Sequence, residues 1–286
     1  MAGSAPRPAD SNTTLVGVMG YPVRHSLSPL LHNTAFAALE LNWTSLAFEV
    51  APGQVAGALS GVRALGLAGI SVTMPHKAEV AALVDECSPV ARALGAVNCV
   101  VNREGTLWGE NTDGAGFLAS LARGAGFNPA GRRCLVLGAG GAARAVALAL
   151  AGAGCADVAV LNRTAARADA VAALAGKVGR VGRFDDDADV AQADLVVNAT
   201  PVGMAGTGAE DEGWLVRPSL LHRGQVVADL IYAPRPTAWL AAAADGGART
   251  VDGLGMLVHQ AAAQLELWTG LPAPVDRMWE AASALV

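Results

Sequence analysis

A glycine-rich turn between an apolar strand and a helix is the feature that most constrains the fold of this chain. The apolar run Cys134–Leu137 is followed at once by Gly138–Ala143, and Ala145–Leu150 continues with helix-forming residues. This order matches the dinucleotide-binding pattern G-x-G-x-x-G/A in the context of strand, turn and helix that the pattern requires. Gly138 permits the tight turn, Gly140 lets the backbone approach a pyrophosphate, and the last alanine lets the helix pack on the strand. The stretch predicts an α/β domain that binds dinucleotide phosphates at a helix start. The alternative is a turn that is merely rich in glycine and alanine.

The end of the next strand indicates which dinucleotide would be bound. Val158–Leu161 predict that strand, Asn162-Arg163-Thr164 follow it, and Arg167 comes one helical turn later. An NAD site usually has an acidic residue here for a free ribose hydroxyl, whereas a 2′-phosphate favours a guanidinium group. The two arginines therefore favour NADP(H) over NAD(H), the alternative being that both are solvated surface residues. Asn198–Gly203, where a later strand ends in a sharp turn, is a candidate floor for a cofactor ring.

A second constraining stretch, Ile70–Lys77, lies in the first half of the chain. Ile70 and Val72 are β-branched and favour a strand. Met74 is expected to be extended because Pro75 follows it, and Pro75 suits the first helical position because it lacks an N–H. Lys77 would then stand in the first turn of a helix, just beyond the carboxyl end of a strand, where open α/β sheets bind ligands. A helix start disfavours an ammonium group, so this lysine is either placed there for function or extends into water.

Strand and helix patterns alternate through the first half of the chain, which predicts an α/β domain with a mainly parallel sheet. Ser28 followed by Pro29 is a typical helix start, with Ser28 as N-cap. A polar stretch at 109–114 precedes a further helix at 117–121 and marks the boundary between two domains. The remaining elements of this half are expected as strands at 15–19, 43–50, 99–101 and 106–108 and as helices at 28–41 and 55–65.

Composition limits the classes of function. Of 286 residues, 52% are hydrophobic and 16% charged, which allows a sizeable core and argues against global disorder. Twenty basic and 25 acidic residues give a net charge of −5, which argues against nucleic acid or an anionic membrane as the main partner. The four cysteines lack metal-ligand spacing, so we expect reduced thiols and no metal. The polar first residues lack the apolar core of a signal peptide, and the glycine-broken run Ala145–Leu161 is too short to span a bilayer. We therefore expect a soluble cytoplasmic protein.

Two domains with a dinucleotide site in the second predict hydride transfer to or from a small molecule. Reduction of a ketone by NADPH also needs a proton donor for the carbonyl oxygen, and a lysine can supply that proton without a metal. Lys77 is the candidate donor, and Asp113, in a polar Asn-Thr-Asp turn, is the candidate partner that holds it. On the pattern alone, the favoured interpretation of Asp113 is a helix cap or a solvated turn residue.

The same motifs, taken in order, resemble the shikimate/quinate dehydrogenase family almost from end to end. Each is weakly specific alone, and their order makes the resemblance specific. The motifs are His25-Ser26-Leu27-Ser28-Pro29, Val72-Thr73-Met74-Pro75-His76-Lys77, Gly95-Ala96-Val97-Asn98, Asn111-Thr112-Asp113-Gly114, Gly138 to Ala142, Asn162-Arg163-Thr164, Asn198-Ala199-Thr200-Pro201, and Gly253 to Val258 leading to Gln260.

The resemblance implies an NADP-dependent oxidoreductase that reduces 3-dehydroshikimate to shikimate in aromatic amino-acid biosynthesis, as a monomer or homodimer. It implies a discontinuous substrate-binding domain, 1–112 with 254–286, and a Rossmann-type NADP-binding domain, 113–253, with a cleft between them. Lys77 would transfer the proton and Asp113 would orient it. The implied substrate-binding residues are Ser26, Ser28, Thr73, Asn98, Tyr232 and Gln260. The implied cofactor-binding residues are Gly138, Ala139, Gly140, Gly141, Ala142, Asn162, Arg163, Thr164, Arg167, Asn198, Thr200, Gly253 and Met256.

One departure from the family pattern concerns the substrate. The family often has asparagine two residues before the strand threonine, where this chain has Ser71, which is shorter and offers one donor instead of two. A contact to a ring hydroxyl there would be weaker or mediated by water. Two alternatives to the implied activity stay open: a relative that acts on quinate or an aminoshikimate-type substrate, and a non-catalytic regulator that binds NADP or a metabolite.

Overall fold

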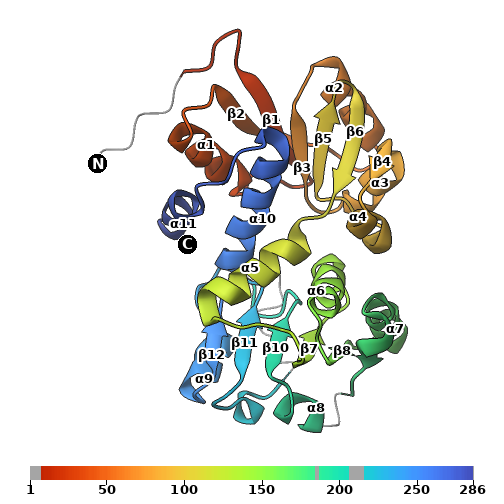
Figure 1. Ribbon diagram of the computed structural model, residues 1–286, viewed down its shortest axis with the longest axis vertical. Helices are drawn as coiled ribbons and strands as arrows, with labels where there is room; N and C mark the ends of the chain where they lie inside the picture. Colours follow the sequence, from red (N-terminus) through yellow and green to blue (C-terminus); the bar gives the residue numbers. More distant parts are fainter. Residues whose placement is uncertain (1–7, 184–186, 206–215, 286) are drawn as a thin grey trace. The chain divides into compact units, whose positions relative to one another are not determined.

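The computed structural model describes residues 8–183, 187–205 and 216–285, and the chain forms two compact units. Unit 1 comprises Met1–Thr112 and Val258–Leu285, and unit 2 comprises Asp113–Leu257. Figure 1 labels most helices and strands of both units. Among the described residues, no helix is both long and apolar enough to cross a membrane.

Unit 1 contains a six-stranded sheet in the order β2-β1-β3-β5-β6-β4. β1 pairs in parallel with β2 and β3, and β4 with β6, whereas β5 runs antiparallel to both of its neighbours. The antiparallel pair β5 and β6 corresponds to the strands predicted at 99–101 and 106–108. The strands are β1 (Thr14–Gly20), β2 (Trp43–Glu49), β3 (Gly69–Val72), β4 (Glu86–Cys87), β5 (Cys99–Arg103) and β6 (Thr106–Glu110).

The helices of unit 1 cover this sheet and bury its apolar side chains. Val55, Leu59 and Val62 of α2 share one buried cluster with Ile70 and Val72 of β3. The helices are α1 (Ser28–Ala38), α2 (Val55–Ala64), α3 (Lys77–Leu83), α4 (Pro89–Leu94), the part of α10 (Gly253–Thr269) from Val258 onward, and α11 (Val275–Ser283).

Two predicted helix starts are wrong in detail. The residue before α1 is Leu27, and no side chain caps this helix, so Ser28 is its first residue and not its N-cap. Pro75 is not the first helical residue either, because His76 precedes α3 and Lys77 begins it. His76 is buried and its Nε2 lies 2.7 Å from the main-chain oxygen of Val50, which holds the turn against the end of β2. This tertiary contact moves the helix start beyond the proline.

Unit 2 has a six-stranded sheet of parallel strands in the order β12-β11-β10-β7-β8-β9. Read from β9, this is the 3-2-1-4-5-6 order of a Rossmann fold, the type of domain that the family resemblance implied. The order reverses between β7 and β10. The strands are β7 (Arg133–Leu137), β8 (Asp157–Leu161), β9 (Gly179–Val181), β10 (Leu195–Asn198), β11 (Val226–Asp229) and β12 (Arg249–Val251).

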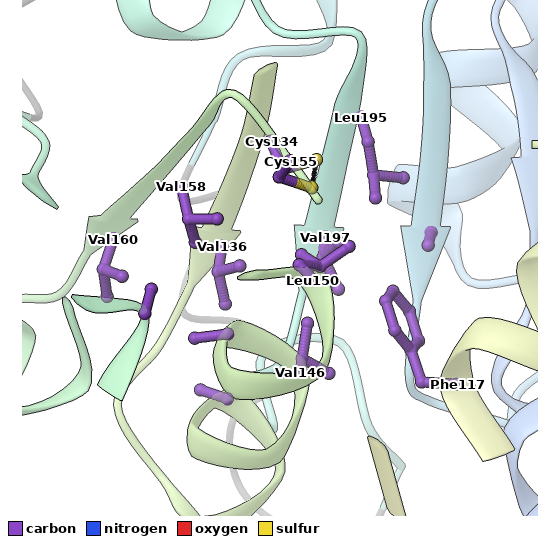
Figure 2. Close-up of a cluster of buried hydrophobic side chains, with 14 of the residues drawn as sticks. Phe117, Cys134, Val136, Val146, Leu150, Cys155, Val158, Val160, Leu195 and Val197 are labelled. Carbon is purple, nitrogen blue, oxygen red and sulfur yellow. Dashed lines mark hydrogen bonds between the residues drawn. The ribbon is translucent and has the colours of Figure 1, made fainter. Parts of the chain in front are cut away.

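Alternate side chains of these strands enter two separate apolar clusters, as a sheet covered on both faces requires. Cys134 and Val136 of β7 belong to one cluster, and Leu135 and Leu137 belong to the other. Figure 2 shows the first cluster, in which Val146 and Leu150 of α6 lie against the strand valines. The helices of unit 2 are α5 (Asp113–Ala125), α6 (Gly141–Gly152), α7 (Ala165–Leu174), α8 (Asp187–Ala191) and α9 (Ala238–Asp245), with short 3-10 turns at Gly176–Val178 and Pro218–Leu220.

Candidate functional site

In unit 1, the candidate proton donor lies at the carboxyl ends of two parallel strands. Met19 of β1 is in register with Val72 of β3, so the loops that follow both strands start at the same edge of the sheet. Thr73 continues this pairing through its N–H, which donates to the main-chain oxygen of Met19 at 2.9 Å. Lys77 begins α3 and is half-buried. The sequence correctly predicted a lysine in the first helical turn beyond a strand.

The two serines predicted to bind a carboxylate lie at the start of α1. Ser28 is buried and Ser26 is half-buried. The main-chain N–H of Ser28 donates to Oγ of Ser26 at 3.3 Å, which holds the side chain of Ser26 at the start of α1. Because the start of a helix carries partial positive charge, this arrangement suits an anion.

A hydrogen-bond network joins Asn98 to helix α10. Asn98 is 1% exposed; its Nδ2 donates to Oγ1 of Thr112 at 3.0 Å, and its Oδ1 accepts from the N–H of Thr112 at 2.8 Å. Oγ1 of Thr112 donates to the main-chain oxygen of Gln260 at 3.0 Å. Nε2 of Gln264 donates to Oε1 of Gln260 at 2.9 Å and to the main-chain oxygen of Asn98 at 3.1 Å. The structure thus brings together the predicted residues Asn98 and Gln260, along with Thr112 and Gln264, to which the sequence analysis gave no role.

Ser71, the departure from the family pattern, lies within β3. It is 5% exposed, and its backbone is in register with Val18 of β1 and Cys99 of β5. Cys99, the partner of Ser71 on β5, directly follows Asn98 in the chain. Ser71 therefore lies in the same part of the sheet as the hydrogen-bond network around Asn98.

In unit 2, Asp113 is the first residue of α5 and is 6% exposed. A carboxylate in the first turn of a helix is stabilised by the helix dipole. The alternative of a solvated turn residue is therefore wrong, because the side chain is buried. A role of Asp113 at the helix start agrees with this position and is compatible with the predicted role of the same carboxylate in holding Lys77.

A cavity of about 220 Å³ lies where the order of the unit 2 strands reverses. Loops after β7, β8 and β10 form its walls, which is the place where doubly wound sheets bind dinucleotides. Seven of the predicted cofactor residues line it, together with four others. The lining residues are Gly138, Ala139, Gly140, Leu161, Asn162, Arg163, Arg167, Ala199, Thr200, Pro201 and Val202.

The glycines in the loop after β7 serve different structural purposes. Gly138 has φ +109°, and a Cβ there would lie 2.9 Å from Cγ2 of Thr200 and 3.0 Å from the main-chain oxygen of Ala199. An added Cβ at Gly140 or Gly141 would meet no described atom within 4 Å. Gly138 is therefore required by the turn and its neighbour, whereas the two following glycines leave open space in front of the start of α6 for a phosphate group.

The loop after β8 carries only cationic and neutral side chains. Nδ2 of Asn162 donates to the main-chain oxygen of Thr164 at 3.1 Å, and the N–H of Arg167 donates to the same oxygen at 3.1 Å. Arg163, Thr164 and Arg167 are exposed, and both arginines line the cavity. The chemistry of this loop fits a 2′-phosphate, as predicted.

The loop after β10 is held by Asn198, which is 5% exposed. Its Oδ1 accepts from the N–H and Oγ1 of Thr200 at 3.0 and 2.7 Å, and its Nδ2 donates to the main-chain oxygen of Val202 and to Oδ1 of Asp229. Oδ1 of Asp229 also accepts from the N–H of Ile231, and burial raises the pKa of this carboxyl to about 6. Asn198 therefore shapes the loop that borders the cavity, whereas Thr200 lines the cavity itself.

The remaining predicted residues of unit 2 lie outside the lining of this cavity. Tyr232 is half-buried, and burial raises the pKa of its phenol. Gly253 begins α10, and a Cβ there would collide with the backbone of Leu230 and Ile231, so close packing alone requires a glycine. Met256 is half-buried and packs against the apolar cluster shown in Figure 2. Gly141 and Thr164 each stand next to a lining residue in the chain, and Ala142 follows Gly141.

A larger cavity of about 380 Å³ lies at the opposite edge of the unit 2 sheet and includes Arg133 and Arg180. Arg180 forms ion pairs with Asp157 at 2.8 Å and with Asp189 at 2.5 Å, so its charge is already compensated within the protein. No glycine-rich loop borders it among the described residues, and the one helix start that contributes to its lining, that of α8, supplies the carboxylate of Asp189. The smaller cavity is therefore the better candidate for a dinucleotide.

Comparisons with known proteins agree with both units. Residues 18–100 match the family described as the shikimate dehydrogenase substrate binding domain, 120–205 match shikimate / quinate 5-dehydrogenase, and 253–282 match the shikimate 5'-dehydrogenase C-terminal domain. A shikimate dehydrogenase (NADP(+)) from Moorella thermoacetica is 49% identical over 94% of this chain and 92% of its own length.

Solved structures are similar over nearly the whole chain. A shikimate dehydrogenase in complex with NADP+ has a TM-score of 0.91 at 36% identity, covering 99% of both chains. The enzyme from Thermus thermophilus in complex with NADP(H) and shikimate has a TM-score of 0.87 at 38% identity, covering 96% of this chain and 100% of that one.

Proposed function

This chain belongs to the shikimate dehydrogenase family, and on that premise we propose that it catalyses the reversible NADPH-dependent reduction of 3-dehydroshikimate to shikimate in aromatic amino-acid biosynthesis. The observation that carries the proposal is the cavity at the strand reversal of unit 2, where a glycine turn and two arginines converge. The domain roles follow from the same premise: 1–112 with 254–286 bind the substrate, and 113–253 bind NADP.

Lys77 acts as the acid and base of the reaction. Bound NADPH supplies a hydride to the carbonyl carbon, and the ammonium of Lys77 gives a proton to the carbonyl oxygen, so that the ketone becomes an alcohol. In the reverse direction the amine removes the hydroxyl proton. Its place beyond the carboxyl end of β3 supports this role, and the family resemblance assigns Asp113 to orient the amine.

The polar groups of unit 1 bind the substrate. Ser26 and Ser28 at the start of α1 suit its carboxylate, because a helix start favours an anion. Thr73, Asn98 and Gln260 contact the ring hydroxyls, and Tyr232 of unit 2 completes the set.

The loops around the unit 2 cavity hold the cofactor. The start of α6, with Gly138–Ala142, binds the pyrophosphate. Asn162, Arg163, Thr164 and Arg167 bind the adenosine phosphate, since guanidinium groups can form paired hydrogen bonds with phosphate. Asn198, Thr200, Gly253 and Met256 border the nicotinamide, Asn198 by fixing the loop.

We also place the protein in the cytoplasm, as a monomer or homodimer. Cys87, Cys99, Cys134 and Cys155 are all free thiols, although Cys134 and Cys155 lie with their sulfurs 3.3 Å apart. Free thiols are typical of reducing compartments.

The test is a steady-state assay of shikimate and quinate oxidation with NADP and with NAD. We expect shikimate with NADP to give the highest kcat/KM, by at least about tenfold over each other pair, because binding groups matched to one ligand reject its analogues. A higher kcat/KM for quinate would identify a quinate-using relative. Absence of turnover with every pair would identify a non-catalytic binding protein.

A further inference from the structure

We propose that Gln264 is a positioning residue that fixes the side-chain amide of Gln260, so that Nε2 of Gln260 is the end that binds a substrate hydroxyl. The inference rests on the proposed function, because it takes Gln260 as a substrate-binding residue. The two glutamines are four residues apart on α10 and therefore lie next to each other on one side of the helix.

The hydrogen bonds of Gln264 determine how its own amide is turned. Its Nε2 lies 3.1 Å from the main-chain oxygen of Asn98. A carbonyl oxygen only accepts hydrogen bonds, so the atom of Gln264 that faces it must be the nitrogen. That oxygen also accepts from the N–H of Val72 at 2.8 Å, which fixes its position between β3 and β5.

The orientation of the Gln264 amide then determines that of Gln260. An amide nitrogen has two hydrogens, and one of them is directed to Asn98. The other is directed to Gln260 over 2.9 Å, so the atom there must be an acceptor, which is Oε1. The NH2 group of Gln260 is therefore at the opposite end of its amide. Reversing either amide would place two donors or two acceptors face to face, which the network does not tolerate.

The main chain of Gln260 is held as well. Oγ1 of Thr112 donates to its carbonyl oxygen, and the same Thr112 is bonded twice to the side chain of Asn98. Gln264, Thr112 and Asn98 thus fix both the backbone and the amide of Gln260. The remaining freedom of its side chain is small, which suits a group that must present its donors to one hydroxyl.

Stability does not explain a glutamine at position 264. Gln264 is 0% exposed, and its Oε1 is a buried acceptor without a hydrogen-bond partner among the described residues. An unpaired buried acceptor destabilises a protein, and an apolar side chain of similar length would avoid that cost. A polar residue at this buried position is explained by the two groups that it orients.

The first test is Gln264→Met, which keeps an unbranched side chain of similar length and removes both donors. We expect the KM for shikimate to rise about fivefold to tenfold, the loss expected for one misplaced hydrogen bond. We expect kcat and the KM for NADP to stay within about twofold of wild type, since the chemistry and the cofactor site are unaffected. The melting temperature should not fall, because an unpaired acceptor is removed.

The matched control is Thr269→Val on the same helix, whose Oγ1 donates to the main-chain oxygen of Leu265 at 2.8 Å. This change should lower the melting temperature without altering the KM for shikimate. A folded Gln264→Met with an unchanged KM for shikimate would overturn the proposal. So would a parallel rise of both KM values with a lower melting temperature, which is the mark of a purely structural role.

A double-mutant cycle tests whether Gln264 acts through Gln260. In a Gln260→Met background, Gln264→Met should cause no further rise in the KM for shikimate. Full additivity of the two changes would contradict the proposal, because it would mean that the two side chains act independently.

Gln260→Glu tests the amide orientation without altering Gln264. The carboxylate keeps an oxygen toward Nε2 of Gln264 and lacks the NH2 end, so we expect a folded protein whose KM for shikimate rises about tenfold. Wild-type affinity for shikimate in this variant would refute the orientation. The activity of the wild-type enzyme distinguishes failure of the proposed function from failure of the inference. Absence of shikimate oxidation by the wild type would refute both. An active wild type together with an unchanged KM for shikimate in Gln264→Met would refute the inference alone.

Discussion

At the scale of single residues, the cavity of unit 2 is bordered by two arginines and by a loop that the side chain of Asn198 holds in place. Arg163 and Arg167 were predicted from their place after a strand, and they line the cavity. Asn198 was also predicted to bind the cofactor, yet both ends of its amide are bonded within the protein. Its partner Asp229 was not predicted at all, because only the tertiary structure brings β10 and β11 side by side.

Arg163 tests the choice of cofactor. We expect Arg163→Ala to raise the KM for NADP by about tenfold to a hundredfold, since hydrogen bonds to a charged group are stronger than neutral ones. The KM for NAD should change little, because NAD has no 2′-phosphate. Steady-state kinetics with both cofactors measures the difference, and an equal loss for both would refute a 2′-phosphate role.

Asp229 gives a pH-dependent prediction for stability. Its pKa is raised from 3.8 to about 6 by burial, so between these values the folded state binds more protons than the unfolded state. The contribution of this group to stability is therefore present at low pH and is lost as pH rises through 6. The variant Asp229→Asn lacks the titrating carboxyl, so its stability does not fall with pH for this reason. Its Oδ1 can still accept the hydrogen bonds from Asn198 and Ile231.

The measurement is urea unfolding of both proteins at several pH values. The free energy of unfolding of Asp229→Asn relative to wild type should increase by up to about 3 kcal/mol between pH 4 and pH 8. A difference that is constant over this range would show that the carboxyl is not perturbed.

At the scale of elements, the strand, turn and helix formed by β7 and α6 were predictable because all of their determinants are local. Helix α5 was predicted only at 117–121, whereas it runs from Asp113 to Ala125. Its first turn contains two glycines, which are weak helix formers, so the pattern indicated a turn. The reason for these glycines is tertiary: a Cβ at Gly114 would lie 2.8 Å from Cβ of Ala149 and 2.9 Å from the main-chain oxygen of Ala145, both on α6.

Gly114 therefore tests the packing of α5 on α6. We expect Gly114→Ala to lower the free energy of unfolding by about 1–3 kcal/mol, because the contacted atoms are a backbone oxygen and a Cβ that cannot move independently. The control is Gly57→Ala in the exposed part of α2, where an added Cβ meets no described atom within 4 Å. That change should stabilise by up to about 1 kcal/mol through helix propensity. Equal effects of the two substitutions in urea unfolding would contradict the packing argument.

At the scale of the whole molecule, the alternation of strands and helices predicted the α/β fold of unit 1, and the glycine-rich turn with the family resemblance predicted a Rossmann-type unit 2. The pattern did not predict the placement of α10 and α11, because nothing local indicates that residues after 258 pack with the first 112. Only the family resemblance implied that return. The short strands β4, β9 and β12 were not predicted either. Two or three residues are too few to show the alternation of apolar and polar side chains that marks a strand.

The central claim is that an amine of unit 1 and a nicotinamide cofactor held by unit 2 act in one reaction. The direct test is Lys77→Ala, assayed for shikimate-dependent reduction of NADP and, separately, for shikimate binding by calorimetry. General acid–base catalysis contributes about a hundredfold to ten-thousandfold, so we predict a fall in kcat of that size with an unchanged melting temperature and a dissociation constant for shikimate within about tenfold of wild type. A variant that turns over at close to the wild-type rate would contradict the account.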